Sequence, residues 1–574
     1  MKLYPEWWEE VKSRLAASGF ERLPTPNDNS WQGPLEVAAS KNEKCRVTIR
    51  VTLPDLFPFQ KPSVFAVHPL IDHSRHKLPG EGSLCLWSDK KDGWDPAYTI
   101  DQILDRVRLW YGCHFSGEWN DTYEPLDLHL YFPGEHPFVV LADGWTPPPD
   151  RMSGSFSVWQ KDGDKDIFVD KIGGDQIVRT SEDVVGKKLL FMRGEANHRG
   201  IWLRLREEPV PFSNLGPMIE AISRAAGMQV NQVLRILEGG LGEKIRPNRQ
   251  HTLFLGLVYP GREGRDQWLF LGADLPQGQK RWARLDNLQT CRLVGYSVTD
   301  GGSAALLRRT QHTAAGLKDK KVALFGLGAI GGSIALLLAK AGFGHLNLID
   351  DDRLRPGNVI RHPASLYSVS LKKSLAMRFE ISEHAPYCDA KALDQPHSWD
   401  ALCGIINGCD MVVSATANPP FELLLNEACL RRDIPVIYVA GFRRASIGQI
   451  QLVRPSKDAC HLCVQHLKNS DCGYPVVPSG DEGEFVEVGC GDPTVEATAV
   501  DLESIATMAA RVAIKHLRND PPAANHWWVV NAPLEGLDML AEGTPGIVPQ
   551  TWRPSPNCPL CCHLIVSTNR DDRT

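Results

Sequence analysis

The sequence predicts a multidomain α/β protein, and three observations lead to this expectation. The chain has 574 residues, enough for roughly three or four domains of ordinary size. Its 43% hydrophobic and 23% charged residues are an ordinary globular mixture that can bury several cores. From residue 301 onward strand and helix patterns alternate, which is typical of a parallel sheet covered by helices. We therefore expect domains over residues 1–125, 126–300 and 301–574.

Residues 1–125 have the pattern of a small α+β domain. Apolar residues with helical spacing occur over residues 7–15, and residues 45–53 alternate as in a half-buried strand. Residues 101–110 are expected to form a helix, with Thr99 or Asp101 near its N-terminus.

The middle region, residues 126–300, contains no repeat and no chemical motif that we can assign. The prolines of residues 147–149 indicate a linker, and residues 252–258 and 268–271 are expected to be strands. We expect an α+β linker domain whose function the sequence does not define.

Residues 321–350 have the pattern of a βαβ unit of the Rossmann kind. A strand over residues 321–325 is followed by a glycine loop, a helix opening at Ser333, and a second strand that ends in Asp350. Glycines let the backbone approach a phosphate, and the helix N-terminus offers unpaired N–H groups to it. Asp350 is placed to hydrogen-bond a ribose hydroxyl. The three glycines of the loop are Gly326, Gly328 and Gly331.

The residues after Asp350 separate this site from that of a dehydrogenase. The continuation contains Asp352, Asn358, Arg361 and Lys373, and it resembles the ubiquitin-activating superfamily, which includes the ThiF and MoeB enzymes that adenylate sulfur-carrier proteins. The resemblance implies that Asp350 binds the ribose, and that Asn358, Arg361 and Lys373 bind ATP and the phosphate under attack. Fixed cations there would stabilise the charge that gathers at the α-phosphate.

Two further residues bear on this resemblance. Arg309 is similar to the arginine that members of the superfamily extend into a partner subunit's ATP site, which implies a homodimer through this domain. Where the superfamily has a magnesium-binding aspartate, this chain has Ala417, within Thr416-Ala417-Asn418. Mg²⁺ must then be bound by another residue such as Asp352, or the site is weaker than is usual in the superfamily.

Two C-x-x-C pairs predict a closed zinc site, because four thiolates complete a tetrahedral coordination sphere. The superfamily has the same paired knuckles. Either Cys562 or His563 is an alternative to the last ligand, and two unrelated redox motifs are the alternative to zinc. The expected ligands are Cys460, Cys463, Cys558 and Cys561.

Cys490 is the first candidate nucleophile, because it precedes a Gly-Asp-Pro turn and a helical pattern, as in the sulfur-carrier-activating enzymes. Nearby helix N–H groups can lower the pKa of a thiol from its ordinary value of about 8.5. Cys472 is its main competitor, and a small buried structural cysteine is the alternative to both. The expected helix has its apolar positions at Val495, Leu502, Ile505, Ala509 and Val512.

Cys85 is the second candidate nucleophile. The segments around it occur in the order found in ubiquitin-conjugating enzymes, which implies that Cys85 accepts an acyl group. One departure concerns the His-Pro-Asn motif, which here reads His68-Pro69-Leu70, so the asparagine thought to stabilise the oxyanion is missing. Polar residues nearby that are candidates for its role are Asp72, His73 and His76. The matching segments are Phe57-Pro-Phe-Gln-Lys-Pro62, His68-Pro69, Gly82-Ser-Leu-Cys85-Leu-Trp87 and Trp94-Asp-Pro-Ala-Tyr-Thr-Ile100.

The two halves together resemble the fused conjugating–activating enzymes of bacterial anti-phage operons of the CBASS type. The resemblance implies that ATP activates the C-terminal carboxylate of a partner protein, such as a nucleotide cyclase of the CD-NTase type. The acyl group would pass from Cys490 to Cys85 and then to an amine on an acceptor protein or small molecule. The alternatives are a sulfur-carrier adenylating and sulfurtransferase enzyme, or an adaptor whose sites have degenerated.

The overall composition and charge exclude several classes of protein function and location. The formal net charge of −6 argues against general nucleic-acid binding, which usually needs a basic surface. Residues 1–10 are acidic where a signal peptide would be apolar, and no apolar run is long enough to span a bilayer. We expect a cytoplasmic protein, in which the 15 cysteines are thiols, metal ligands and nucleophiles rather than disulfides.

Overall fold

The computed structural model describes most of the chain. The described residues are 5–24, 29–40, 43–71, 76–77, 82–87, 93–117, 119, 128–132, 134–142, 145–160, 165–172, 198–241, 251–261, 266–275, 288–470, 473–485, 494–537 and 545–561. They form two compact units, and the second unit begins at Gly301, directly after Asp300. The division of the first unit at residue 125 remains a prediction.

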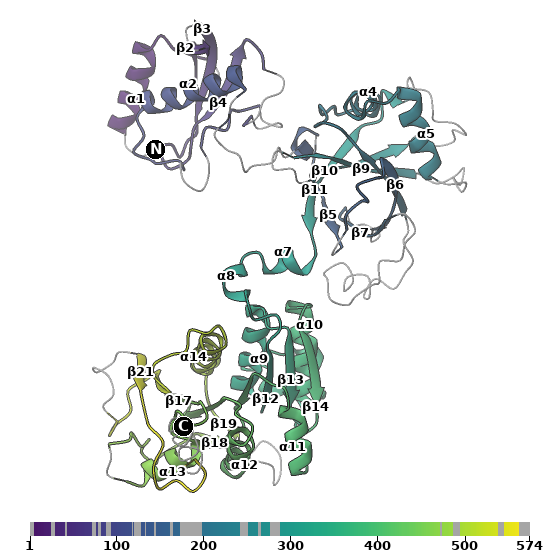
Figure 1. The fold of residues 1–574 in the computed structure, drawn as a ribbon. Helices are drawn as coiled ribbons and strands as arrows, with labels where there is room; N and C mark the ends of the chain where they lie inside the picture. The colour runs from purple at the N-terminus through teal and green to yellow at the C-terminus, as the bar shows by residue number, and fades with distance from the viewer. Residues whose placement is uncertain are drawn as a thin grey trace, which may run out of the picture. The chain divides into compact units, whose positions relative to one another are not determined.

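The first unit begins with a four-stranded antiparallel sheet in the order β1-β2-β3-β4 (Figure 1). Helix α2 packs against β2, and α1 contributes Trp8 and Leu15 to the same hydrophobic core. Thr99 begins α2 with a reciprocal capping box to Gln102, as one of the two sequence alternatives predicted. The elements are α1 (Pro5–Ala17), β1 (Glu21–Arg22), β2 (Asn29–Ser40), β3 (Glu43–Leu53), β4 (Ser63–His68) and α2 (Ile100–Ser116).

The rest of the first unit is a closed barrel with strand order β10-β11-β5-β7-β6-β8-β9, which the sequence did not predict. All seven strands contribute to one aromatic-rich cluster that fills the interior. Gly200 makes room for it, because a Cβ there would lie 2.1 Å from the ring of Phe156. The strands are β5 (Phe138–Leu141), β6 (Ser153–Gln160), β7 (Ile167–Ile172), β8 (His198–Arg204), β9 (His251–Pro260), β10 (Asp266–Leu275) and β11 (Leu293–Asp300); the helices are η1 (Leu128–Tyr131), α4 (Leu215–Ala226) and α5 (Val230–Leu241).

The second unit is built on an eight-stranded sheet in the order β14-β13-β12-β15-β16-β17-β20-β21. The first five strands of this order are parallel, and the pairs from β16 to β21 are antiparallel. The strands are β12 (Lys321–Phe325), β13 (His345–Ile349), β14 (Asp389–Leu393), β15 (Met411–Ser414), β16 (Val436–Phe442), β17 (Ile447–Val453), β20 (His526–Val530) and β21 (Gly546–Gln550), with a separate pair β18 (Glu484–Phe485) and β19 (Thr494–Val495).

Helices cover both faces of this sheet, as a βαβ pattern predicts. One buried cluster joins the sheet to α9, α10 and α14, and another joins it to α11, α12 and α13. The expected helix start at Ser333 was four residues late, because α9 begins at Ala329, directly after the glycine loop. The helices are α7 (Ser303–Leu307), α8 (Gln311–Ala314), α9 (Ala329–Ala341), η2 (Pro356–Asn358), η3 (Leu366–Ser368), α10 (Lys373–His384), α11 (Trp399–Ile406), α12 (Pro419–Leu430), α13 (His461–Lys468) and α14 (Ala499–Leu517).

Within the described residues, none of the helices combines the length and the apolar character that crossing a membrane requires.

Candidate functional site

The glycine loop presents backbone amides at the start of α9. Gly326 has a φ of +79°, and a Cβ there would lie 2.7 Å from the carbonyl oxygen of Ala415. A Cβ at Gly331 would lie 1.9 Å from the carbonyl oxygen of Gly326. Gly328, by contrast, faces open space. The tight turn therefore requires glycine at two positions and leaves the helix N-terminus open to an anion.

A cavity of about 230 Å³ adjoins this helix N-terminus. Four residues predicted from the sequence to bind nucleotide line it, namely Gly328, Asn358, Arg361 and Lys373. The structure thus brings together two cations and backbone amides, a composition that suits an anionic ligand. Small and apolar residues complete the wall, among them Val439, Ala440, Gly441, Ala445, Val495, Ala497 and Leu502.

The acids that follow β13 organise the cation side of the cavity. Lys373 forms an ion pair with Asp352, and its backbone N–H donates to the Asp352 carbonyl oxygen at 2.7 Å. Burial alone would raise the pKa of Asp352, but the hydrogen bond and charge of Lys373 outweigh burial and hold that pKa below its ordinary value. Lys373 is therefore positioned by a carboxylate that remains ionised.

Asp350 ties the glycine loop to β13. One carboxylate oxygen accepts the Leu327 N–H at 2.7 Å, and the other accepts the Asp352 N–H at 2.8 Å. Burial raises the pKa of Asp350, and these two hydrogen bonds oppose that shift. Asp350 is not among the described residues that line the cavity, so ribose binding by its carboxylate remains a prediction.

His362 lines the cavity, although the sequence analysis gave it no role. Its Nδ1 accepts the Ala364 N–H at 3.0 Å, so its proton lies on Nε2, which is 2.8 Å from the Leu327 carbonyl oxygen. Burial lowers the pKa of His362, which favours this neutral form. The ring joins the segment that carries Arg361 to the glycine loop. Its position directly after Arg361 is the signal that could have identified it.

Arg361 donates a hydrogen bond to the carbonyl oxygen of Val495, in β19. The expectation that Val495 belongs to the helix after Cys490 was wrong. Helix α14 begins at Ala499, because Thr498 caps it by accepting the Asp501 N–H at 3.2 Å. Val495 instead lies in a short strand that borders the cavity.

Ala417 also lines the cavity, in a left-handed conformation with a φ of +50°. Its neighbour Thr416 and Ser414 both hydrogen-bond to the Glu422 carboxylate, at 3.4 and 3.2 Å. Burial raises the pKa of Glu422. The described lining contains no carboxylate, so a protein ligand for Mg²⁺ would come from a neighbouring residue such as Asp352.

Arg309 lies between α7 and α8 and is exposed to solvent. It does not belong to the described lining of the cavity in its own chain. The proposed insertion of Arg309 into a partner subunit remains a prediction.

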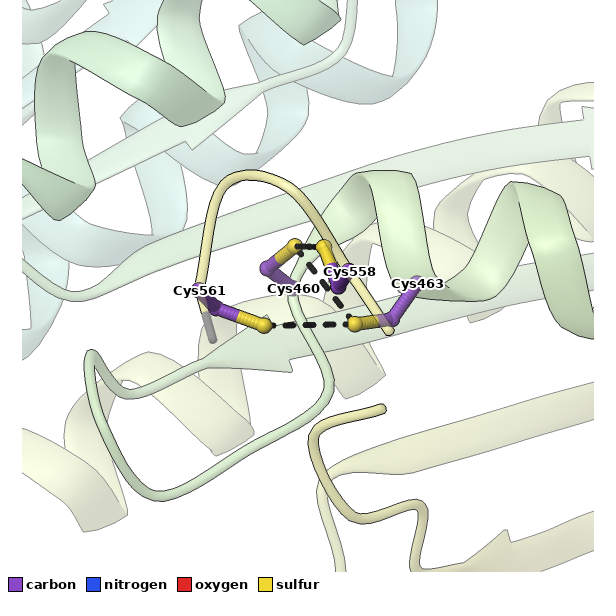
Figure 2. Close-up of side chains that lie close together, drawn as sticks. All are labelled: Cys460, Cys463, Cys558 and Cys561. Carbon is purple, nitrogen blue, oxygen red and sulfur yellow. Dashed lines mark hydrogen bonds between the residues drawn. The ribbon is translucent and has the colours of Figure 1, made fainter. Parts of the chain in front are cut away.

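The four knuckle cysteines lie close together on the side of the sheet covered by α12 and α13. Figure 2 shows their side chains pointing toward one another. The Cys460 sulfur lies 3.7 Å from the Cys463 sulfur and 3.6 Å from the Cys558 sulfur. The sulfurs of Cys463 and Cys561 are 3.4 Å apart. Four sulfurs around zinc at about 2.3 Å would lie about 3.8 Å from one another, so the buried cluster fits that ion.

The alternative ligands Cys562 and His563 lie outside the described residues. The Ser555 N–H points at the Cys463 sulfur at 3.4 Å, which is the kind of hydrogen bond that favours a thiolate.

Cys490 and Cys472 also lie outside the described residues, but the strands on either side of Cys490 do not. Strand β18 pairs antiparallel with β19, with Glu484 opposite Val495 and Phe485 opposite Thr494. The segment that contains Cys490 therefore begins and ends at this ladder, one strand of which borders the cavity.

Cys85 is half-buried in the first unit, after the β-bridge between Lys77 and Leu84. Its backbone N–H donates to the His76 carbonyl oxygen at 2.6 Å, and its sulfur lies 3.8 Å from the carbonyl oxygen of Trp87. The Trp87 ring packs edge-on against Trp94, 5.1 Å away. Trp87 and Trp94, from two of the segments that predict a conjugating-enzyme-like domain, thus pack beside the loop that carries the thiol.

Of the three polar residues predicted to replace the missing asparagine near Cys85, the structure describes His76. Leu70, in place of the asparagine, is 74% exposed, and its side chain cannot donate a hydrogen bond. His76 has a left-handed φ of 55°, and its ring lies 4.8 Å from that of Trp119. Asp72 and His73 lie outside the described residues.

Comparison with known proteins places the cavity and its glycine loop within one matched region. Residues 305–542 match the model of the ThiF family. "Uncharacterized protein y4qC" of Sinorhizobium fredii is 23% identical and aligns with 95% of this chain and 92% of its own length. The alignment with this relative therefore spans nearly the whole length of both chains.

Two relatives whose names state an activity match part of this chain. "Adenylyltransferase and sulfurtransferase MOCS3" of Drosophila sechellia is 29% identical over 35% of this chain and 40% of its own. "ATP-dependent ubiquitin transferase-like protein Cap2" of Vibrio cholerae is 23% identical over 46% of this chain and 45% of its own. Among solved structures, the microcin C7 biosynthetic enzyme MccB with N-formylated MccA has 19% identity, covers 45% of this chain and 72% of its own, and gives a TM-score of 0.35.

Proposed function

Because the C-terminal half of this chain contains a ThiF family domain, we propose that it activates the C-terminal carboxylate of a partner protein with ATP. The observation that carries this proposal is the convergence of Asn358, Arg361 and Lys373 on the cavity at the start of α9. A carboxylate oxygen of the partner would attack the α-phosphate, forming an acyl-adenylate and releasing pyrophosphate. The two cations and the helix amides would stabilise the charge that develops on the phosphate.

The acyl group would then move through two thiols. The Cys490 thiolate attacks the acyl carbon, so that a C–S bond forms and AMP leaves. The Cys85 thiolate next displaces Cys490 from the acyl carbon. An amine of an acceptor finally displaces Cys85, which gives an amide. Each thiol receives and releases one acyl group, and ATP is the only source of energy.

Two metal ions belong to the proposal. Mg²⁺ would accompany the ATP phosphates, and Asp352 is the carboxylate best placed to assist, because it already contacts a lining residue. Zn²⁺ would be held by the four buried cysteines, where a closed thiolate sphere holds two distant segments together and leaves no position for substrate.

The proposed biological setting is anti-phage defence, because both halves of the chain resemble the fused conjugating–activating enzymes of anti-phage operons. A relative named as a ubiquitin transferase-like protein supports this setting, and a nucleotide cyclase is a candidate partner. The second candidate function, activation of a sulfur carrier, is favoured by the similarity to an adenylyltransferase and sulfurtransferase. A sulfur carrier needs no second acyl-bearing thiol, so Cys85 favours protein conjugation.

Pyrophosphate exchange into ATP tests the first step. The substrate would be a synthetic peptide with the C-terminal sequence of a candidate cyclase, and the matched control would be the same peptide ending in an amide. We expect exchange with the free acid alone, and loss of exchange in Arg361→Ala. Exchange that proceeds equally with the amidated peptide, or tight NADH binding without ATP binding, would reject the adenylation proposal.

Non-reducing gels with the intact partner test the relay. Cys85→Ala should still form a reducible thioester with the partner but no reductant-resistant product. Cys490→Ala should retain exchange and load neither thiol. Loading of Cys85 in Cys490→Ala would assign the first transfer to Cys472 or to direct attack on the adenylate. A persulfide on Cys490 in place of a thioester would favour sulfur transfer.

A further inference from the structure

We propose that Glu422 is a positioning residue of the nucleotide site, because its buried side chain holds the segment of residues 414–417 against the glycine loop. The inference rests on the proposed function, since it concerns how the cavity is shaped for ATP. Glu422 itself is not among the described residues that line the cavity. It would act through the cavity wall that it supports.

The segment that leads from β15 to α12 has two faces, because side chains alternate along an extended chain. Ala415 and Ala417 line the cavity. Ser414 and Thr416 instead donate their hydroxyls to one carboxyl oxygen of Glu422, at 3.2 and 3.4 Å. The two hydroxyl oxygens also lie 3.1 Å from each other. Glu422 therefore binds the back of a wall whose front faces the cavity.

The same wall packs tightly on the glycine loop. The Ala415 N–H donates to the carbonyl oxygen of Phe325, the last residue before the loop, at 2.8 Å. A Cβ at Gly326 would lie 2.7 Å from the Ala415 carbonyl oxygen and 3.0 Å from the Thr416 Cα. A Cβ at Gly331 would lie 3.2 Å from the Ala415 Cβ. Because the contact leaves no room for a methyl group, a shift of the wall would also displace the loop that presents its amides to phosphate.

The helix that carries Glu422 is anchored beside the glycine loop as well. Asn418 caps α12 by accepting the Phe421 N–H at 3.2 Å, which places Glu422 in the first turn of the helix. The Phe421 ring lies 5.4 Å from the ring of Phe325, which directly precedes Gly326. The start of α12 therefore has a fixed position relative to the loop, and so has the side chain of Glu422.

Contacts on the far side of Glu422 connect it to two further elements. The Tyr438 hydroxyl, on β16, donates to the Glu422 carbonyl oxygen at 3.4 Å. The second carboxyl oxygen of Glu422 lies 3.6 Å from Nε2 of His461, at the start of α13. The His461 ring is held in turn, because its Nδ1 lies 3.0 Å from the amide oxygen of Gln451. Through Glu422 the cavity wall is tied to β16 and α13 as well as to α12.

The burial of Glu422 favours a role in positioning over a role in stability. Glu422 is 7% exposed, and burial raises the pKa of its carboxyl group. Well-packed apolar residues can replace buried charged groups without loss of stability, because they avoid the cost of removing a polar group from water. An apolar side chain cannot accept a hydrogen bond, however, and the fully buried Ser414 would lose its acceptor. The acceptor is therefore the property to test.

The test uses the full-length protein and needs no partner. Isothermal titration measures the affinity for ATP with Mg²⁺, at a temperature where thermal unfolding shows that each variant is folded. Glu422→Leu removes the acceptor, whereas Glu422→Gln keeps an oxygen that can accept from both hydroxyls. Ser414→Ala with Thr416→Val removes the two donors and leaves Glu422 in place. Glu427→Gln, on the same helix at a surface ion pair with Arg431, is the matched control.

We expect Glu422→Leu to weaken ATP binding about tenfold, a size typical of coupling between two sites. Glu422→Gln should stay within about threefold of the wild type, because the acceptor is kept. The variant that lacks both donors should weaken binding as Glu422→Leu does. Combining all three substitutions should weaken it by less than about twofold more, because they remove the same contact. Glu427→Gln should bind ATP as the wild type does.

Unchanged ATP affinity in Glu422→Leu would overturn the inference and, with a lowered melting temperature, would assign Glu422 to stability alone. Losses that multiply when the acceptor and donor variants are combined would also overturn it. An equal loss in Glu422→Gln and Glu422→Leu would show that the negative charge acts in place of the hydrogen bonds, which again rejects the inference. These outcomes differ from failure of the proposed function, in which the wild type itself would bind no ATP.

Discussion

Lys373 forms an ion pair with Asp352, so a cation that lines the cavity at the start of α9 is held in place by a carboxylate of its own chain. The pairing explains why Lys373 can line the cavity as a fixed charge, although lysine side chains are ordinarily flexible. It also gives Asp352 a defined role, whether or not its carboxylate contacts a metal ion.

The first prediction concerns this pair. Lys373→Ala should weaken ATP binding by at least about tenfold, because it removes a charge-assisted contact to phosphate. Asp352→Asn should weaken it less, because the ammonium remains but is no longer oriented. Isothermal titration of ATP into both variants measures which substitution weakens ATP binding more. A larger loss in Asp352→Asn than in Lys373→Ala would indicate that Asp352 acts chiefly on the metal ion.

The second prediction concerns the glycine loop. Gly331→Ala should abolish nucleotide binding and lower the melting temperature, because its Cβ would lie 1.9 Å from the Gly326 carbonyl oxygen, a backbone atom that cannot move aside cheaply. Gly328→Ala, whose Cβ would meet no atom within 4 Å, is the matched control and should remain stable. Thermal unfolding and ATP titration of the two variants separate the effects. Equal stability of the two would contradict the packing that we describe.

The third prediction concerns the cysteine cluster. The purified protein should contain one zinc ion per chain, and Cys558→Ser should release it and destabilise the second unit, because one lost thiolate opens a closed site. Metal analysis and thermal unfolding check both statements. Cys429→Ser, a buried cysteine outside the cluster, is the control and should keep its metal. Absence of zinc from the wild type would contradict the proposal.

The fourth prediction concerns pH. His526 is buried, its Nε2 lies 3.0 Å from the side chains of Gln449 and Tyr474, and burial lowers its pKa from 6.5 to about 3. Below pH 6.5 the unfolded chain therefore binds a proton that the folded chain does not. This contribution to stability is complete above pH 6.5 and falls by at most about 1.4 kcal/mol per pH unit toward pH 3.

Urea unfolding at pH 7 and pH 5 should show this loss, and His526→Asn should show a smaller dependence on pH. The wild type and His526→Asn both retain His461, whose pKa is also lowered by burial. The difference between their pH dependences therefore reports on His526 alone. An identical pH dependence in the two proteins would show that His526 binds its proton equally well in the folded and the unfolded chain.

The convergence of the predicted residues on one cavity could be expected from sequence, because these residues belong to short segments with local rules. The glycine loop lies within the βαβ unit of residues 321–350, and Asn358, Arg361 and Lys373 follow in the segment that leads from β13 to the start of α10. That Val495 lines the cavity could not be predicted, because Val495 follows Arg361 by more than 130 residues in the sequence and reaches the cavity only through the folding of the intervening chain. Helical spacing alone placed that residue in the wrong element.

The barrel shows a second reason why part of the fold could not be predicted from the sequence. Its strands pair out of sequence order, with β8 beside β9 but β5 beside β11, and a short apolar run does not indicate its partner. The expected strands over residues 252–258 and 268–271 were confirmed as β9 and β10, but their closure into a barrel depends on contacts that no local pattern encodes.

Strand β2 shows a third reason. Gly33-Pro34 is typical of a turn, yet both residues lie within a strand of 12 residues. Strand β1 pairs with β2 only at Trp31 and Gln32, so Pro34 lies where that edge has no neighbour to bond. A Cβ at Gly33 would lie 2.7 Å from the Cα of Phe20, so glycine allows the chain to cross closely.

The aromatic residues that fill the barrel interior restrict which substitutions this part of the chain can accept during evolution. Phe156 occupies the space left by Gly200, and the Trp202 ring likewise lies against Gly154. Neither member of such a pair can be exchanged alone, since a larger residue would collide and a smaller ring would leave a void. Substitutions at these positions should be correlated among homologues, so an alignment could test the barrel without any biochemical assay.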